Sequence, residues 1–238
     1  MKAPSWTLPD SLPQIADETD LHLRSALSGD ATRFAEFRAI YEERFPPEQR
    51  LPWPEIERGM REGRFFFAGV WLDGAAAAFA LLTVLPASRA CHVGFLAVDR
   101  RHEGEGAATA VARLRTVVMG TRAPNGLLLE IEDPATAPTP AQARHRERLR
   151  RMYERWDARM VCPSGYGMPH PAGEEVIPLQ LMWMPGSAAP DHMRGEILVT
   201  AVEEMWRDSY LVPGPDPRLD AVREAARSAG PSLDVTLA

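Results

Sequence analysis

The amino-acid sequence predicts a fold of the α+β or mixed α/β class, with a mostly antiparallel sheet flanked by helices. Three consecutive segments read as strands, a Gly-containing turn and an amphipathic segment follow them, and more strand-like segments come later. Strands joined by short turns pair antiparallel, whereas a strand that follows a helix returns by a crossover. The order of these segments therefore predicts hairpins first and a crossover after the Gly turn.

Two helices are expected before the first strand. From Asp30 to Phe45 apolar residues recur at helical spacing, and Pro46 and Pro47 end the pattern. A second, shorter helix fits Pro54 to Glu62. The aromatic residues of this part are expected to be mainly core, namely Phe34, Phe37, Tyr41, Phe45 and Trp53.

Three strands are expected next. They span residues 64–72, 75–85 and 90–98, and the Asp73-Gly74 pair between the first two is a strong hairpin signal. The turn of Asp99 to Ala108 then leads into an amphipathic helix, which ends in the segment from Gly120 to Gly126.

The remaining elements alternate between strands and helices. Leu127 to Glu132 predicts a strand, and an Arg-rich helix is expected over residues 141–157. Closing strands are expected over residues 159–162 and 176–184, with further helices over residues 197–206 and 219–229.

Composition excludes several functional classes. The chain has 238 residues, a formal net charge of -6 and a sequence pI of about 5.6, which disfavours nucleic-acid binding through a general basic surface. No apolar run reaches the roughly 18 residues that a membrane span needs, and the first residues do not resemble a secretory signal. Two cysteines, Cys91 and Cys162, give no metal cage or disulfide framework. We therefore expect a cytoplasmic protein that uses no metal and acts at neither membrane nor nucleic acid.

The turn after the third strand is suited to an anionic ligand. Amide groups at the first turn of a helix have no helical partner, and they point outward with the positive end of the helix dipole. Gly104 and Gly106 would let a ligand approach the backbone without obstruction from a Cβ atom. The segment fits a diphosphate cradle, although a plain strand-to-helix turn with two glycines explains it as well.

A wider pattern around this turn resembles the GCN5-related N-acetyltransferase (GNAT) superfamily. Leu96-Ala97-Val98-Asp99 resembles the strand end of its motif A, and residues 103–108 resemble the Gly-rich loop. Residues 152–159 resemble its Phe-Tyr-x-x-x-Gly-Phe box, with Asp157 at the Gly position. The resemblance implies a mostly antiparallel central sheet whose fourth and fifth strands splay apart. It also implies three parts of the chain: an arm over 1–25, an acyltransferase domain over 26–186 and a C-terminal helical extension over 187–238.

The resemblance further implies that acetyl-CoA, or another acyl-CoA, binds between the splayed strands. Arg101 is included because a shifted register that starts at this residue also gives the Arg-x-x-Gly-x-Gly pattern of the loop motif. The implied coenzyme contacts are Leu96, Ala97, Val98, Arg101, Glu103, Gly104, Glu105, Gly106, Ala107 and Ala108.

In this superfamily an amine attacks the thioester directly, so a proton donor and a base are needed. Tyr153 occupies the Tyr position of the box and is the expected donor; the alternative is a tyrosine packed in the core. Strand alternation puts Glu130 on the face opposite Leu129 and Ile131, so it is the candidate base; the alternative is a solvated strand end. His92 is a weaker candidate base, and Glu132 and Asp133 would attract a cationic amine.

These inferences predict an acetyl-CoA-dependent N-acetyltransferase that acts on a primary amine of a small molecule or peptide. Glu103 and Glu105 have the wrong charge for a diphosphate, which Arg100 and Arg101 would offset. One alternative is therefore a catalytically degenerate binding or assembly protein with the same fold. A second is an acyltransferase that uses a longer or carrier-bound acyl donor. Dimers are common in the superfamily, so a homodimer is possible.

Overall fold

The computed structural model describes residues 31–72, 74–102, 125–170, 175–186, 188–189, 193 and 195–228. The chain divides into two compact units. Among the described residues, the first unit comprises residues 31–81 and 95–102, and the second comprises residues 82–94 and those from 125 onward. The boundary between residues 81 and 82 lies within one strand, and the boundary between residues 94 and 95 lies within the next. Each of these two strands therefore contributes residues to both units.

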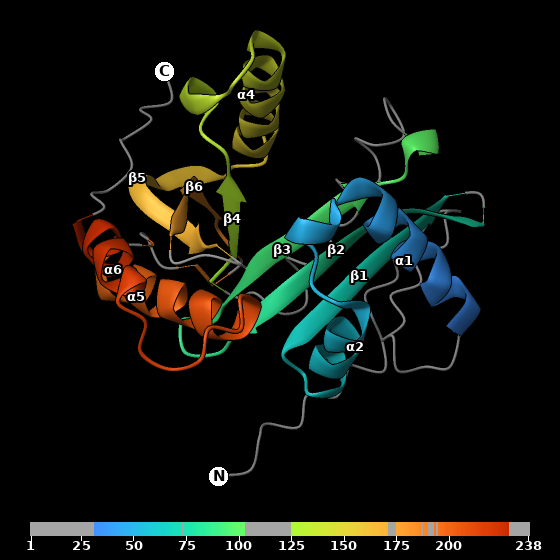
Figure 1. Ribbon diagram of the computed structural model, residues 1–238, viewed down its shortest axis with the longest axis horizontal. Helices are drawn as coiled ribbons and strands as arrows, with labels where there is room; N and C mark the ends of the chain where they lie inside the picture. Colours follow the sequence, from blue (N-terminus) through green and yellow to red (C-terminus); the bar gives the residue numbers. More distant parts are fainter. Residues whose placement is uncertain are drawn as a thin grey trace. The chain divides into compact units, whose positions relative to one another are not determined.

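The strands of the described residues form a mixed sheet in the order β1-β2-β3-β4-β6-β5 (Figure 1). β4 is parallel to β3 and antiparallel to β6, and β5 is antiparallel to β6. This arrangement confirms the predicted fold class. The bounds are Phe65–Leu72 for β1, Ala75–Leu85 for β2, Ala90–Val98 for β3, Leu127–Ile131 for β4, Arg159–Pro169 for β5 and Val176–Met184 for β6.

The parallel pair has a short register. Cys91 pairs with Leu127 and His92 with Leu128, close to the start of both strands. Within the described residues, β3 and β4 pair at these two positions, although β3 continues to Val98 and β4 to Ile131. Strands that splay apart, as the resemblance implies, would pair in this way near their starts and separate farther along.

The first unit has an aromatic core. Helix α1 (Ala31–Arg44) buries Phe37 and Tyr41, and the short helices η1 (Pro47–Gln49) and α2 (Trp53–Arg61) follow it. The Phe37 ring lies against Gly69 of β1, where an added Cβ atom would be 2.4 Å from Phe37 Cζ. Glycine at this position lets the ring pack directly on the strand backbone. The expectation that Phe37 and Tyr41 are core residues is confirmed, because each is almost fully buried.

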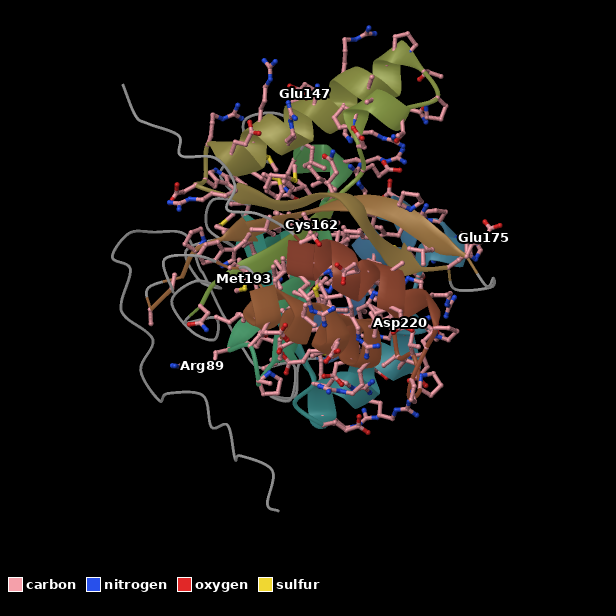
Figure 2. All side chains as sticks on the ribbon, turned by 90° about the vertical axis from the view of Figure 1, so that its left-hand side faces the viewer. Arg89, Glu147, Cys162, Glu175, Met193 and Asp220 are labelled. Carbon is pink, nitrogen blue, oxygen red and sulfur yellow. The ribbon has the colours of Figure 1, made fainter. Side chains whose placement is uncertain are left out.

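The second unit has a core built by strands and C-terminal helices. Helix α5 (Gly195–Glu204) contacts α6 (Arg218–Ser228), and α6 contacts β5. In Figure 2, Cys162 of β5 and Met193 are labelled, and both belong to this core. Its largest buried members also include Leu128, Tyr166, Leu181, Trp183, Leu198, Val202, Met205, Trp206 and Val222. The domain limits stay predictions, but residues on both sides of position 187 share this core.

Helix α4 (Pro140–Glu154) ends three residues earlier than expected. Thr139 caps its start by accepting a hydrogen bond from Gln142 N, and Tyr153 is its buried residue. Figure 2 shows its long side chains extending outward, with Glu147 on this helix. The chain turns after it because Asp157 adopts a positive φ of 66°. Glycine adopts this conformation most easily, and aspartate tolerates it better than most residues.

The other differences concern element limits. β5 extends to Pro169, with register shifts between Met160 and Cys162 and between Cys162 and Tyr166. The helix expected over residues 197–206 continues beyond α5 as the π-helical turn η4 (Met205–Ser209). The short helices η2 (Arg100–His102) and η3 (Pro134–Thr136) lie in segments that were expected to be turn and loop. The described helices include none with the length and apolar character that crossing a membrane requires.

A buried carboxylate joins α5 to the β2–β3 turn. Glu204, at the end of α5, accepts hydrogen bonds from Ala87 N at 2.7 Å, Ser88 N at 2.9 Å and Ser88 Oγ at 2.7 Å. Its side chain is 3% exposed. Because buried amide groups need acceptors, this carboxylate fixes the turn against the helix.

Replacing Glu204 by Ala should therefore destabilise the protein by about 2 to 3 kcal/mol, because buried donors lose their acceptor. Glu203→Ala is the matched control. Glu203 is half exposed and pairs with Arg223 at 2.7 Å, so its loss should cost less than about 1 kcal/mol. Urea unfolding of both variants measures the difference. Equal stability of the two would show that Glu204 does not hold the turn.

Candidate active site

Glu130 of β4 lies at the centre of a cluster of hydrogen-bonding side chains. Its Oε2 atom is 3.0 Å from His92 Nε2 of β3 and also accepts a hydrogen bond from the Tyr210 hydroxyl. Its Oε1 atom accepts a hydrogen bond from the Tyr166 hydroxyl of β5 at 2.5 Å. The Glu130 side chain is 11% exposed. The predicted base is thus an enclosed, well-bonded carboxylate and not a solvated strand end.

The cluster continues inward from His92. The other ring nitrogen, Nδ1, lies 2.8 Å from Ser209 Oγ, the last residue of η4. Ser209 Oγ in turn lies 2.7 Å from Thr83 Oγ1 of β2. All three side chains are buried. A continuous chain of hydrogen bonds therefore runs from Thr83 through Ser209 and His92 to Glu130.

Two opposing effects determine the charge of Glu130. Burial raises the pKa of this carboxyl, because a low-dielectric environment disfavours the charged form. The charge and hydrogen bond of His92 and the two tyrosine hydroxyls act the other way and bring the pKa below its ordinary value. Glu130 is therefore ionised at neutral pH. Burial, together with the charge and hydrogen bond of Glu130, raises the pKa of Tyr166 and Tyr210.

Tyr153 lies elsewhere in the second unit. It is buried near the end of α4, with its ring centroid 6.0 Å from that of Trp156. Burial raises its pKa to about 12, so the phenol is a weaker acid than an ordinary tyrosine. Tyr153 is not among the residues that bond Glu130, and its role as proton donor stays a prediction.

The structure describes only part of the expected coenzyme loop. Leu96, Ala97 and Val98 are residues of β3, and Ala97 is buried. Arg101 Nε and Nη2 bind the two carboxylate oxygens of Asp99 at 2.9 and 2.8 Å. This contact lowers the pKa of Asp99. The other expected contacts lie outside the described residues, namely Glu103, Gly104, Glu105, Gly106, Ala107 and Ala108.

The charged side chains expected near the coenzyme loop and the acceptor amine already form ion pairs or hydrogen bonds within the protein. Arg100 pairs with Glu43 at 2.9 Å, and Arg101 pairs with Asp99, so neither cation is fully available to offset Glu103 and Glu105. Glu132 forms a two-point ion pair with Arg146, at 2.7 and 3.0 Å. The Asp133 carboxylate accepts a hydrogen bond from Ala135 N at the start of η3.

Sequence reasoning missed four members of the cluster. No sequence motif includes Thr83, Tyr166, Ser209 or Tyr210, and Tyr166 lies beyond the strand expected over residues 159–162. His92 was noted only as a weaker base, without its partners. In the described part of the chain, no group of three or more His, Cys, Asp or Glu side chains is placed to hold a metal ion.

Comparison with known proteins finds a family match for part of the chain. Residues 34–123 match the model of the Acetyltransferase (GNAT) family. The match spans less than half of the chain, and this segment is similar to GNAT acetyltransferase domains. A search of curated proteins finds no match. His92 lies within the matched segment, whereas Glu130, Tyr153, Tyr166, Ser209 and Tyr210 follow it.

A solved structure with a TM-score above 0.5 shares the fold, and two further structures show lower similarity. A GNAT-family protein from Bacteroides thetaiotaomicron is 17% identical, and the match covers 77% of this chain and 94% of that chain with a TM-score of 0.59. The ribosomal-protein-S18-alanine N-acetyltransferase from Escherichia coli is 18% identical, with 67% and 92% covered and a TM-score of 0.43. A phosphinothricin acetyltransferase from Sinorhizobium meliloti, in complex with acetyl-CoA, is 12% identical, with 66% and 87% covered and a TM-score of 0.43.

All four tyrosines of the chain have a raised pKa, with burial as the largest cause. An exposed tyrosine ionises near pH 10. Because the folded values are higher, the stability that depends on neutral phenols is complete below about pH 10 and is lost as the pH rises through the folded values. Tyrosinate absorbance should therefore stay absent near pH 10 and appear together with loss of circular dichroism at higher pH. A reversible tyrosine titration near pH 10 in the folded protein would contradict this.

Proposed function

We propose that the protein is an acetyl-CoA-dependent N-acetyltransferase that acts on a primary amine of a small molecule or a peptide. The GNAT family match over residues 34–123 carries the proposal. The buried, ionised Glu130 supports it, because a carboxylate kept charged against burial is typical of functional sites. Acetyl-CoA would be the second substrate.

In the proposed reaction the amine nitrogen attacks the thioester carbonyl carbon, and the carbon–sulfur bond of coenzyme A breaks. The amine must lose a proton, and Glu130 is the group proposed to accept it. The leaving thiolate needs a proton, and Tyr153 is the group proposed to supply it. The diphosphate would bind the backbone amides of residues 103–108, and the pantetheine arm would pair with Leu96 to Val98.

One alternative has an observation in its favour. Glu103 and Glu105 are unfavourable beside a diphosphate, and the neighbouring Arg100 and Arg101 already have acidic partners. These facts favour a non-catalytic GNAT protein that binds or assembles with another molecule. A longer or carrier-bound acyl donor is a further possibility, which a comparison of donors of increasing chain length addresses. The homodimer and the cytoplasmic location stay predictions.

Coenzyme binding is the first test. Isothermal titration with acetyl-CoA should show saturable binding, and Gly106→Leu should abolish it, because the side chain would block a ligand from the loop backbone. Ser228→Leu, at an exposed position of α6, is a control that should bind as the wild type does. No heat of binding at millimolar acetyl-CoA would remove the enzymatic proposal and leave the binding protein.

The two proposed catalytic side chains are tested by turnover. With acetyl-CoA and a panel of primary alkylamines and short peptides, Glu130→Gln should lower kcat by about 10²-fold or more, the usual effect of losing a general base. Tyr153→Phe should lower kcat while acetyl-CoA binding is kept. Tyr41→Phe is the matched control, because Tyr41 is also buried and its hydroxyl bonds Leu51 instead. Unchanged turnover in Glu130→Gln would exclude Glu130 as the base.

A further inference from the structure

The hydrogen bonds around Glu130 have a definite direction. An ionised carboxylate only accepts hydrogen bonds, so Tyr166, Tyr210 and His92 Nε2 must all donate to it. His92 is therefore protonated at Nε2. When the imidazole is neutral, its proton is at Nε2, so Nδ1 has a lone pair and this buried acceptor needs a donor. In the charged form, which lowers the Glu130 pKa, Nδ1–H donates to Ser209 instead.

Ser209 is placed to be that donor. Its Oγ atom lies 2.8 Å from His92 Nδ1, and both side chains are buried away from water. A hydroxyl donates one hydrogen bond and accepts others, so a Ser209 that donates to His92 must accept from the Thr83 hydroxyl, whose Oγ1 lies 2.7 Å away. Ser209 and Tyr210 come from η4 and the residue after it, far beyond the segment that matches the GNAT family model.

We infer that His92, Tyr166 and Tyr210 are positioning residues for Glu130, and that Ser209 fixes His92 in the form protonated at Nε2. The inference rests on the proposed function, in which Glu130 takes the proton of the acceptor amine. The three donors hold the carboxylate in one orientation and keep it ionised. Ser209 acts through His92, so a residue of the C-terminal segment contributes to the proton-accepting group.

Burying Glu130 and its hydrogen-bond donors brings little gain in stability, which supports a functional role for them. A buried carboxylate and its donors are often no more stable than well-packed apolar residues of the same volume. Here one buried cluster of polar side chains draws its members from four parts of the chain, namely β3, β4, β5 and the segment after α5. The hydrogen bonds satisfy both imidazole nitrogens, and a satisfied network of this kind restricts the orientation of its members.

The ring nitrogens of His92 give a test that needs no substrate. In protein labelled with ¹⁵N-histidine, the His92 signals, assigned with His92→Gln, should show a protonated Nε2 and an unprotonated, hydrogen-bonded Nδ1. Ser209→Ala should shift the Nδ1 signal, Ser209→Thr should restore it, and Ser228→Ala, on exposed α6, should leave it unchanged. A wild-type His92 with a bare Nε2, or an unmoved signal in Ser209→Ala, would overturn the inference.

Kinetics test the positioning role. Without its donors the buried carboxyl is protonated more easily, so Ser209→Ala and Tyr210→Phe should move the acid limb of the kcat–pH profile to higher pH. Each should lower kcat by about tenfold, and Ser209→Thr should recover most of it. The probe is acetyl-CoA with the most reactive amine of the panel, and Ser228→Ala is the control.

The two proposals fail in different ways. If the wild type binds acetyl-CoA and acetylates amines while the acid limb stays unmoved in Ser209→Ala and Tyr210→Phe, the positioning role is wrong and the proposed function stands. If the wild type does not bind acetyl-CoA, the proposed function is wrong and the positioning role falls with it, whatever form His92 adopts.

Discussion

The buried carboxylate of Glu130 must be surrounded by hydrogen-bond donors, and this requirement constrains how the strands and helices of the second unit pack together. Glu130 alternates with the buried Leu129 and Ile131 in β4, so its side chain enters the other face of the strand. Withdrawing an unpaired carboxylate from water is very unfavourable. Three donors from β3, β5 and the segment after η4 make the burial possible. The positions of those elements are therefore tied to one carboxylate.

The C-terminal helices acquire a defined place from the same interactions. The apolar side chains of α5, η4 and α6 pack in the core with β4, β5 and β6, and Glu204 binds the β2–β3 turn. The packing brings Ser209 to His92 and Tyr210 to Glu130. A segment outside the matched GNAT residues thus completes the hydrogen bonding of the group proposed to accept the proton.

Local patterns predicted where most of the described strands and helices lie, but they could not supply the partners of Glu130. Apolar runs and the Asp-Gly pair predicted β2 and β3 with the bounds that the structure shows, and alternation over residues 127–132 singled out Glu130. The end of α4 was misplaced because Asp157 takes the positive φ where the family motif has glycine. His92, Tyr166 and Tyr210 are 38, 36 and 80 residues from Glu130 along the chain, and only tertiary packing brings them together. The loop of residues 103–108 lies outside the described residues, so its predicted role is carried by the motif and the family match.

The central claim is that the donors around Glu130 overcome its burial and keep it charged. Carboxyl ¹³C NMR of protein labelled at glutamate, with Glu130→Gln to assign the signal, measures this pKa directly. The account predicts that Glu130 titrates below the ordinary range of glutamate and that Tyr210→Phe raises the value. A Glu130 pKa above the ordinary range in the wild type would mean that burial dominates, and the carboxyl would then be neutral where the account requires a base.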